Sequence, residues 1–371
     1  MNIHSLWRNF VKSAIFVTAC ISGHKCLQGI TSSLHYHKVF TSRFSSGADE
    51  EENDCLFVSH LTGEDLPNCG SSRTPYRSLP QALRQVRDGG KICLDGRKSE
   101  LHPYGCLRMD NGPFAVERII IHKSVTIKGQ FSEAHISCQN PADLIFGTHT
   151  TGGILQVTLF NLVFNATRVI LYNVCSFNVE ITKCKFVNCP YGVGRRQEES
   201  FAPSCQKSTL AVSDSEFWYN INSIEVYLFD EFFNLTISRC LFQGKKGQFN
   251  VTSEDRKTTG AVYVRSTVSR ELPRMYLHVS LTDSIFRELG HEDNGFAFSV
   301  RIRHYVSDGN LTLSNTSFLK NENAVFVHSG FGLRLTKVTI NSTYGYAIMA
   351  SGPPKTTSTT PGINALLDEC L

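Results

Sequence analysis

The sequence is short of charge, and what charge it has is not gathered into blocks of one sign. Asp, Glu, Lys and Arg make up 19% of its 371 residues, and the formal net charge is only +4. No run rich in Lys and Arg occurs. A clustered basic patch is the footprint of a nucleic-acid-binding protein, so we expect no nucleic-acid partner.

The signatures of the common catalytic and metal sites are missing as well. The chain has no His-Glu-x-x-His, Cys-x-x-Cys or Gly-x-Ser-x-Gly motif, its 13 histidines are scattered, and its 13 cysteines lack zinc-ligand spacing. We therefore expect no catalytic residues, no bound metal and no cofactor.

A short apolar stretch, residues 13–21, is confined to the N-terminus. It follows the basic residues Arg8 and Lys12 and ends beside the small residue Ser22. This order is typical of a secretory signal, so we predict a signal peptide over 1–22 with cleavage after Ser22. Beyond it, no apolar run approaches the roughly 18 residues of a transmembrane helix, and we expect no membrane span in this chain.

Cysteine is plentiful. Signal cleavage would leave 12 of the 13, an even number compatible with disulfides in an oxidising compartment. Cys55 and Cys69 flank the region before the first predicted coil, and Cys189 and Cys205 flank a long loop. Cys55–Cys69 and Cys189–Cys205 are therefore our candidate disulfides, while the sequence alone does not fix the connectivity.

Six Asn-X-Ser/Thr sequons favour the same secretory route. They stand at Asn165, Asn234, Asn250, Asn310, Asn315 and Asn341, mostly beside the strands predicted below. We predict N-glycosylation at these positions and a location outside the cell, either secreted or on the extracellular face of the cell surface.

An eight-position repeat decides the architecture. The template reads apolar, any, apolar, Ser/Thr, any, small, any, Phe. Copies occupy 179–186, 210–217, 235–242, 279–286 and 311–318, with a degenerate sixth at 333–340 and looser relatives starting at Val125 and Leu155. Apolar residues at alternate positions predict strands, and the interruption between the third and fifth positions predicts a tight bend between two short strands.

A third short strand follows in most copies, at 224–228, 261–264, 298–302, 324–327 and 347–350. Three short strands per coil, stacked in parallel on the next coil, predict an all-β fold, a right-handed parallel β-helix (a solenoid of about nine coils). The template phenylalanines should then line up in one interior, with the thiols of Cys184 and Cys240 buried among them. An antiparallel sandwich is the alternative, but its hairpin signals are mostly missing.

Charged and polar residues fill the fifth template position, which carries Lys183, Asp214, Arg239, Asp283, Asn315 and Lys337 in successive coils. Opposite charges on adjacent coils would stand side by side, as cross-strand pairs do. We interpret this stripe as structural rather than as a calcium site, which needs 6 to 8 oxygen ligands.

The segment from Ser78 to Val86 has helical spacing and a Ser before its first turn, so we predict an N-terminal capping helix over the open end of the core. We divide the chain into a flexible pre-domain segment at 23–54, a β-helix domain at 55–352, and a Pro/Thr-rich linker and C-terminal tail at 353–371.

The capping segment runs into Gly90-Lys-Ile-Cys-Leu-Asp-Gly96, and the coils follow. With these features the chain resembles the right-handed β-helix proteins of the pectin lyase-like superfamily. It looks most like the extracellular β-helix ectodomains of uncharacterised animal surface proteins. The resemblance implies a fold more than a function. It also implies that a carbohydrate would lie along one sheet. However, the Asn-Thr-Asp, Asp-Asp and Gly-His-Gly motifs of the family's hydrolases do not occur in this sequence.

The third strand carries the surface that we single out as a ligand-binding face. We place Tyr227, Tyr263, Ser299, Phe326 and Met349 in one outward column and Arg265, Arg301 and His328 in the next. Exposed aromatics beside basic groups suit stacking on sugar rings, or binding of an acidic glycan or protein. Our ligand-binding candidates are Tyr227, Tyr263, Arg265, Arg301, Phe326 and His328. Loops that cover this face are the alternative.

We therefore expect a non-catalytic extracellular glycoprotein module for binding carbohydrate or a surface protein in adhesion. Two alternatives stay open: a polysaccharide lyase or glycoside hydrolase with a site that these motifs do not reveal, and a structural ectodomain fragment. An enzyme should gather two or three Asp or Glu on the outward face of the third strand, where we find Glu225 and little else.

Overall fold

A computed structural model describes most of the chain from residue 54 onward. The described residues are 54–106, 118–147, 153–196, 205–228, 230–244, 260–266, 276–289, 296–301, 308–328, 331–341, 346–351 and 364–368. The predicted signal peptide at 1–22, nearly all of segment 23–54, and Asn250 lie outside them. No helix within these ranges combines the length and the apolar character needed to cross a membrane.

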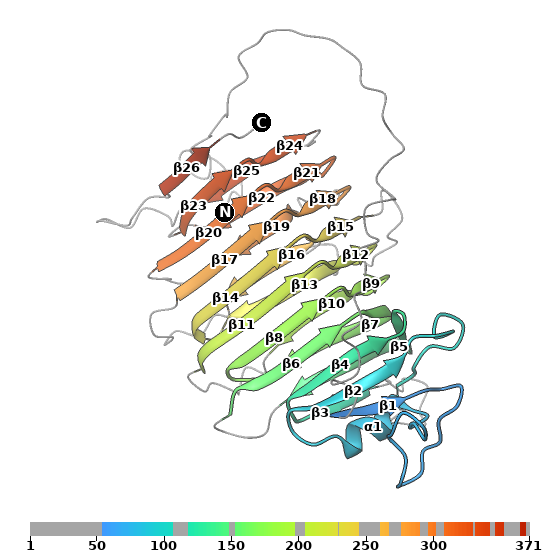
Figure 1. Cartoon of the computed structure of the whole chain (residues 1–371). Helices are drawn as coiled ribbons and strands as arrows, with labels where there is room; N and C mark the ends of the chain where they lie inside the picture. The colour runs from blue at the N-terminus through green and yellow to red at the C-terminus, as the bar shows by residue number, and fades with distance from the viewer. Residues whose placement is uncertain are drawn as a thin grey trace, which may run out of the picture.

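The chain winds into two long parallel sheets that together make a parallel β-helix (Figure 1). The first strands of successive coils form an 11-stranded sheet. In spatial order it consists of β1 (Cys55–Val58), β2 (Gly90–Asp95), β4 (Val125–Gln130), β6 (Leu155–Phe160), β8 (Phe177–Thr182), β11 (Cys205–Ser213), β14 (Asp230–Ser238), β17 (Tyr276–Thr282), β20 (Asp308–Ser314), β23 (Phe331–Thr336) and β26 (Asn364–Asp368).

The second and third strands of the coils share a 15-stranded sheet. Its second strands are β9 (Lys185–Val187), β12 (Glu216–Trp218), β15 (Leu241–Gln243), β18 (Ile285–Arg287), β21 (Ser317–Leu319) and β24 (Thr339–Asn341). Its third strands are β3 (Arg118–Ile121), β10 (Tyr191–Arg196), β13 (Asn222–Leu228), β16 (Val262–Ser266), β19 (Phe296–Arg301), β22 (Asn323–His328) and β25 (Ile348–Ser351). Two longer strands, β5 (Ala134–Gly147) and β7 (Leu162–Tyr172), each supply both the second and the third strand of their coil.

The stack is longer than the nine coils expected, because one strand is added at each end. At the start, β1 precedes the predicted first coil and pairs with β2. At the far end, β26 pairs with β23 although it lies within the expected tail 353–371. The stacking therefore continues past residue 352.

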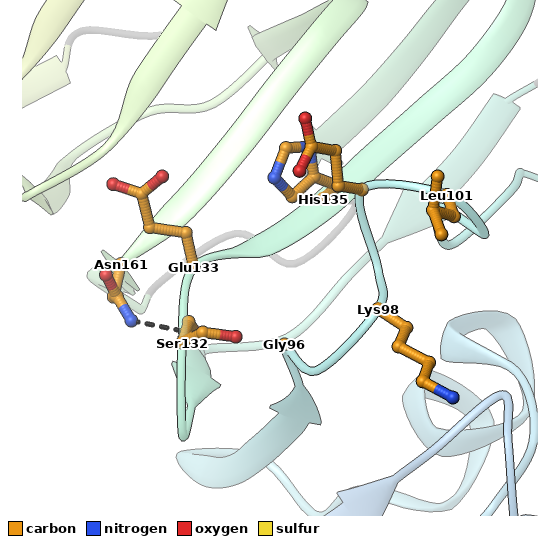
Figure 2. A pocket seen from close by; sticks show the side chains of 8 residues that line it. Gly96, Lys98, Leu101, Ser132, Glu133, His135 and Asn161 are labelled. Carbon is orange, nitrogen blue, oxygen red and sulfur yellow. Dashed lines mark hydrogen bonds between the residues drawn. The ribbon is translucent and has the colours of Figure 1, made fainter.

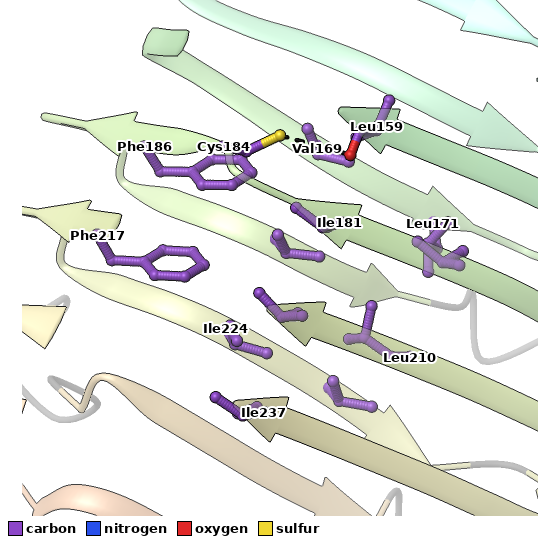
Figure 3. Close-up of a cluster of buried hydrophobic side chains, with 14 of the residues drawn as sticks. Leu159, Val169, Leu171, Ile181, Cys184, Phe186, Leu210, Phe217, Ile224 and Ile237 are labelled. Carbon is purple, nitrogen blue, oxygen red and sulfur yellow. Dashed lines mark hydrogen bonds between the residues drawn. The ribbon is translucent and has the colours of Figure 1, made fainter. Parts of the chain in front are cut away.

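The template phenylalanines form one ladder through the interior, as predicted, and Figure 3 shows two of them, Phe186 and Phe217. The rings of Phe186, Phe217, Phe242, Phe286 and Phe318 are fully buried, and successive ring centroids lie 4.9, 4.8, 4.5 and 4.8 Å apart. These spacings match the separation of neighbouring strands, about 4.8 Å, so each coil delivers its ring onto the ring below. Burying such a side chain stabilises the fold by roughly 1.5–3 kcal/mol.

The fifth template position is the bend. Its residues have φ angles between 48° and 53°, in the left-handed region, although none of them is glycine. Their side chains pair along the stack: Arg239 donates to both carboxylate oxygens of Asp214 at 2.6 and 2.7 Å, and Asn315 Nδ2 donates to Asp283 at 2.5 Å. The bond from Arg239 holds the pKa of the Asp214 carboxyl below its ordinary value. The predicted pairing of opposite charges on adjacent coils is therefore confirmed for Asp214 and Arg239.

One short helix, α1 (Leu79–Gln85), covers the N-terminal end of the core (Figure 1). The side chain of Ser78 accepts a hydrogen bond from the Gln81 backbone at 3.3 Å, and Leu79 and Ala82 are fully buried. The helix follows β1 in the chain and packs beside β1 and β2.

Both predicted disulfide pairings are wrong. The described chain forms Cys55–Cys93, Cys106–Cys138 and Cys175–Cys205, with partners 38, 32 and 30 residues apart. Cysteines about one coil apart meet because parallel stacking superimposes them, whereas cysteines that flank a single loop do not. Cys69 and Cys189 are therefore free thiols, and Cys189 lies in the interior with its Sγ 3.2 Å from the Thr167 carbonyl. Three disulfides indicate an oxidising, extracellular environment.

Candidate functional site

The outward side chains of the third strands fall into two columns, because neighbouring strands are held in register. One column consists of Ile170, Gly194, Glu225, Tyr263, Ser299, Phe326 and Met349. The other consists of Tyr172, Arg196, Tyr227, Arg265, Arg301, His328 and Ser351. The third-strand face therefore has an alternating column of tyrosine and arginine beside a column that holds one carboxylate.

Tyr227 lies in the arginine column and not in the aromatic column in which the sequence placed it. Glu225 occupies the expected position instead, directly beside Tyr263, while Tyr227 is beside Arg265. The alternation of side chains correctly identifies the outward face, but it does not fix how far one strand is shifted along the next.

The predicted aromatic column is largely covered. Tyr263 is only 7% exposed and Ser299 only 2%, so the expectation of an exposed ring is wrong for Tyr263. Tyr227, Arg265 and Phe326 are half-buried. Arg301 and His328 lie on β19 and β22 as expected, but their side chains are outside the described part of the chain.

Glu225 is a buried carboxylate between two arginines. Its Oε1 lies 3.1 Å from Arg265 Nη2 and its Oε2 lies 3.8 Å from Arg196 Nη2. Burial raises the pKa of Glu225, and the two guanidinium groups oppose that rise. The Arg265 guanidinium also lies 3.8 Å from the ring centroid of Tyr227 and 5.3 Å from that of Tyr263, within cation–π range.

The second arginine has a similar arrangement on the adjacent coil. Arg196 lies 4.5 Å from the ring centroid of Tyr191. On the same strand, Gly194 is aligned with Glu225 and faces open space, since a Cβ built there would meet no atom within 4 Å. We call Tyr191, Arg196, Glu225, Tyr227 and Arg265 the Arg–Tyr cluster. The side chains of Arg196 and Arg265 are 38% and 29% exposed, so both can reach a ligand.

The Arg–Tyr cluster holds one carboxylate, that of Glu225. Among the third-strand segments that the structure describes, the other acidic residue is Asp143, which accepts a hydrogen bond from Arg168 at 2.5 Å. It lies on β5, three strand steps from β13, which is roughly 14 Å at about 4.8 Å per step. Paired glycosidase carboxylates stand about 5–9.5 Å apart. Within the described ranges, no group of three or more His, Cys, Asp or Glu is placed to hold a metal ion.

Sequence reasoning missed Arg196 and Tyr191. The segment Tyr191-Gly-Val-Gly-Arg-Arg196 keeps the alternation, with Val193 inward and Arg196 outward. The two glycines, Gly192 and Gly194, leave too few side chains to mark this segment as a strand, so only the pairing of β10 with β7 and β13 reveals it.

A separate hollow of about 610 Å³ lies at the turns of the first coils (Figure 2). It is lined by Gly96, Lys98, Glu100, Leu101, Ser132, Glu133, His135 and Asn161. Asn161 Nδ2 donates to the Ser132 carbonyl at 3.1 Å, and a Glu133 oxygen lies 2.8 Å from Lys185 Nζ. The lining mixes acidic, basic and neutral groups and does not select one ligand chemistry.

No protein-family model matches the chain, and no curated protein matches its sequence. Among solved structures, the chain is similar to a rhamnogalacturonan lyase at 10% identity, over 83% of this chain and 89% of that one, with a TM-score of 0.35. It is also similar to a GH136 lacto-N-biosidase from Eubacterium ramulus at 9% identity, over 77% of this chain and 56% of that one, with a TM-score of 0.33. Both are distant similarities, and neither gives a role to any residue of this chain.

Proposed function

We propose that this protein is a non-catalytic extracellular module that binds acidic carbohydrate through the Arg–Tyr cluster. The observation that carries the proposal is the pair of guanidinium groups, from Arg196 and Arg265, that share one buried carboxylate and stack on tyrosines. Both arginines are held in place before a ligand arrives, which reduces the entropy lost on binding.

The charge balance favours an anionic ligand. Two guanidinium groups and one carboxylate leave a net charge of +1 even when Glu225 is ionised, and Arg301 follows Arg265 in the same column. A guanidinium binds a carboxylate or sulfate group through two parallel hydrogen bonds, and a tyrosine ring stacks on the apolar face of a sugar. A polymer of acidic sugars offers both partners at once.

The predicted glycosylation sites support the choice of this face. Of the five sequons that the described residues include, Asn234 and Asn310 lie on the 11-stranded sheet, Asn315 lies at a bend, and Asn165 and Asn341 lie on second-strand segments. Glycans at these positions would leave the third-strand face open to a ligand.

The test is retention of the secreted protein on immobilised acidic and neutral polysaccharides. We expect retention on the acidic ones alone, and about a tenfold weaker affinity for each of Arg196→Gln and Tyr227→Ala, equivalent to about 1.4 kcal/mol. Arg334→Gln, an exposed arginine on β23 of the other sheet, is the matched control and should bind as the unchanged protein does. Equal binding by all three variants, or binding to acidic proteins only, would refute the proposal.

An enzymatic role is the second candidate, and Glu225 is the observation that favours it. A carboxyl group whose pKa is raised by burial, beside Arg and Tyr, has the character of a catalytic acid. The same polysaccharides should be incubated with the protein and followed for unsaturated products and new reducing ends. Product that disappears in Glu225→Gln would establish the enzyme, whereas retention without product supports the binding module.

A further inference from the structure

The outer face of β14 carries an aromatic ring next to a glycosylation sequon. Phe232, Asn234 and Thr236 alternate along the strand, and residues two apart share one face of a sheet. Phe232 is 37% exposed. Asn234 is half-buried, and its Oδ1 atom is buried without a hydrogen-bond partner among the described residues.

The neighbouring strand β17 extends this apolar surface. Tyr276 is aligned with Phe232 and is 43% exposed, and His278 is aligned with Asn234 and is also exposed. Strands stand about 4.8 Å apart, so the two aromatic side chains lie side by side. On the other side, Lys207 of β11 is aligned with Phe232, and its Nζ lies 5.5 Å from the centroid of that ring. The two adjacent exposed rings form a small apolar surface on this face of the sheet.

We propose that Asn234 carries an N-linked glycan whose first N-acetylglucosamine packs on the ring of Phe232, with Tyr276 extending the same platform. In the attachment step, Nδ2 displaces the diphosphate from C1 of a lipid-diphosphate-linked oligosaccharide. The N–C1 bond forms, the C1–O bond breaks, and Nδ2 loses one proton. The apolar C–H face of the sugar then stacks on the ring, an arrangement that aromatic side chains favour.

The four other sequons that the described residues include lack this feature. Two residues before Asn165, Asn310, Asn315 and Asn341 stand Val163, Asp308, Leu313 and Thr339, none of them aromatic. Asn310 is the best internal control, because it lies on the same face and in the same column as Asn234, each of them beside His278. The inference is independent of the ligand proposed for the Arg–Tyr cluster.

The experiment uses the full chain secreted from glycosylating animal cells, with site occupancy measured by mass spectrometry and stability by Tm. We expect Asn234 to be occupied. Asn234→Gln should lower Tm by about 2 °C when Phe232 is present and should have no effect on Tm in a Phe232→Ser background. Asn310→Gln should change Tm equally in both backgrounds.

An unoccupied Asn234, or an equal loss of Tm from Asn234→Gln in both backgrounds, would overturn the inference. Phe232→Ser alters an exposed position, so we expect the variant to fold. Circular dichroism checks this. Should Phe232→Ser fail to be secreted, Tyr276→Ser provides the second background, in which the effect of Asn234→Gln should be reduced.

Discussion

Arg195 is a charged residue that the fold places inside the solenoid. It faces inward on β10, is 1% exposed, and pairs with both carboxylate oxygens of Asp230. Ser208 donates to the same carboxylate at 2.6 Å, and the guanidinium lies 4.9 Å from the ring centroid of Phe177. A buried charge is tolerated only when it is paired and hydrogen-bonded in this way.

Removing one partner of this pair should lower the free energy of unfolding far more than replacing both partners with apolar residues. We expect Asp230→Ala to lower the free energy of unfolding by about 3–5 kcal/mol, since it leaves a buried guanidinium without its counter-ion. The double variant Arg195→Met with Asp230→Leu should recover most of that loss. Urea unfolding measures both. If Asp230→Ala lowers the free energy of unfolding by less than about 1 kcal/mol, Arg195 and Asp230 do not form a buried ion pair.

The interior thiols should be chemically silent. Burial raises the pKa of Cys184, Cys189 and Cys240 to about 12, and only the thiolate reacts with alkylating reagents. At pH 8, iodoacetamide should leave all three unmodified in the folded protein and modify them in urea, as peptide mass spectrometry would show. Modification without urea at the rate of a free thiol would be inconsistent with the stacked core.

His60 should make the N-terminal end sensitive to acid. Burial, and then the neighbouring His102, lower the pKa of His60, with Asp95 opposing the change. The unfolded chain therefore takes up the proton more readily, so the stability contributed by neutral His60 is present above about pH 6.5 and lost as pH falls through the folded-state pKa. Tm should fall less between pH 7.5 and 5 for His60→Asn than for the unchanged protein; parallel curves would contradict this.

At the scale of elements, the second strands depend on the phenylalanine ladder. Each is only three residues long, and β9, β12, β15 and β18 each hold one phenylalanine ring against the rings of the coils on both sides. Three residues make too few hydrogen bonds for a stable strand, so packing along the stack supplies most of the stabilisation.

Phe242→Ala should therefore lower the free energy of unfolding by about 3–5 kcal/mol, because it opens a cavity between two fully buried rings. Phe131→Ala is the matched control. That ring is 65% exposed beside Arg97 at 4.4 Å, and its loss should cost about 1 kcal/mol or less. Denaturant titration compares the two, and similar losses would show that the ladder is not the main support.

For the whole molecule, a solenoid opens from its ends because each coil contacts only its neighbours. Cys55–Cys93 ties β1 to β2 at the N-terminal end. Replacing both cysteines with Ser should raise amide hydrogen exchange in β1 and β2, and leave β11 and β14 as protected as before. Equal loss of protection throughout would mean that the whole solenoid unfolds as one unit.

Much of this architecture can be predicted from sequence, for a definite reason. The inward positions of the template, such as Phe186 and Phe318, are set by the period-two alternation of strands, and recurrence of the template implies stacking. The bend at Asp214 and its pairing with Arg239 follow from the same recurrence. All of these features repeat locally, so they can be read without knowing how the loops run.

The candidate site could be predicted only in part. The sequence placed Tyr227 and Arg265 on the correct face but shifted Tyr227 by one column, took Tyr263 as exposed, and passed over Arg196. It also paired Cys55 with Cys69, where stacking pairs it with Cys93.

The sequence by itself determined that apolar residues alternate and recur, and therefore that short strands must bury them together in a stacked core. Only the tertiary structure decided the register between coils, and with it the disulfides, the burial of Glu225 and the arginines beside it. The physical reason is that register depends on how loops of unequal length return the chain to the stack, and the repeated positions carry no information about that.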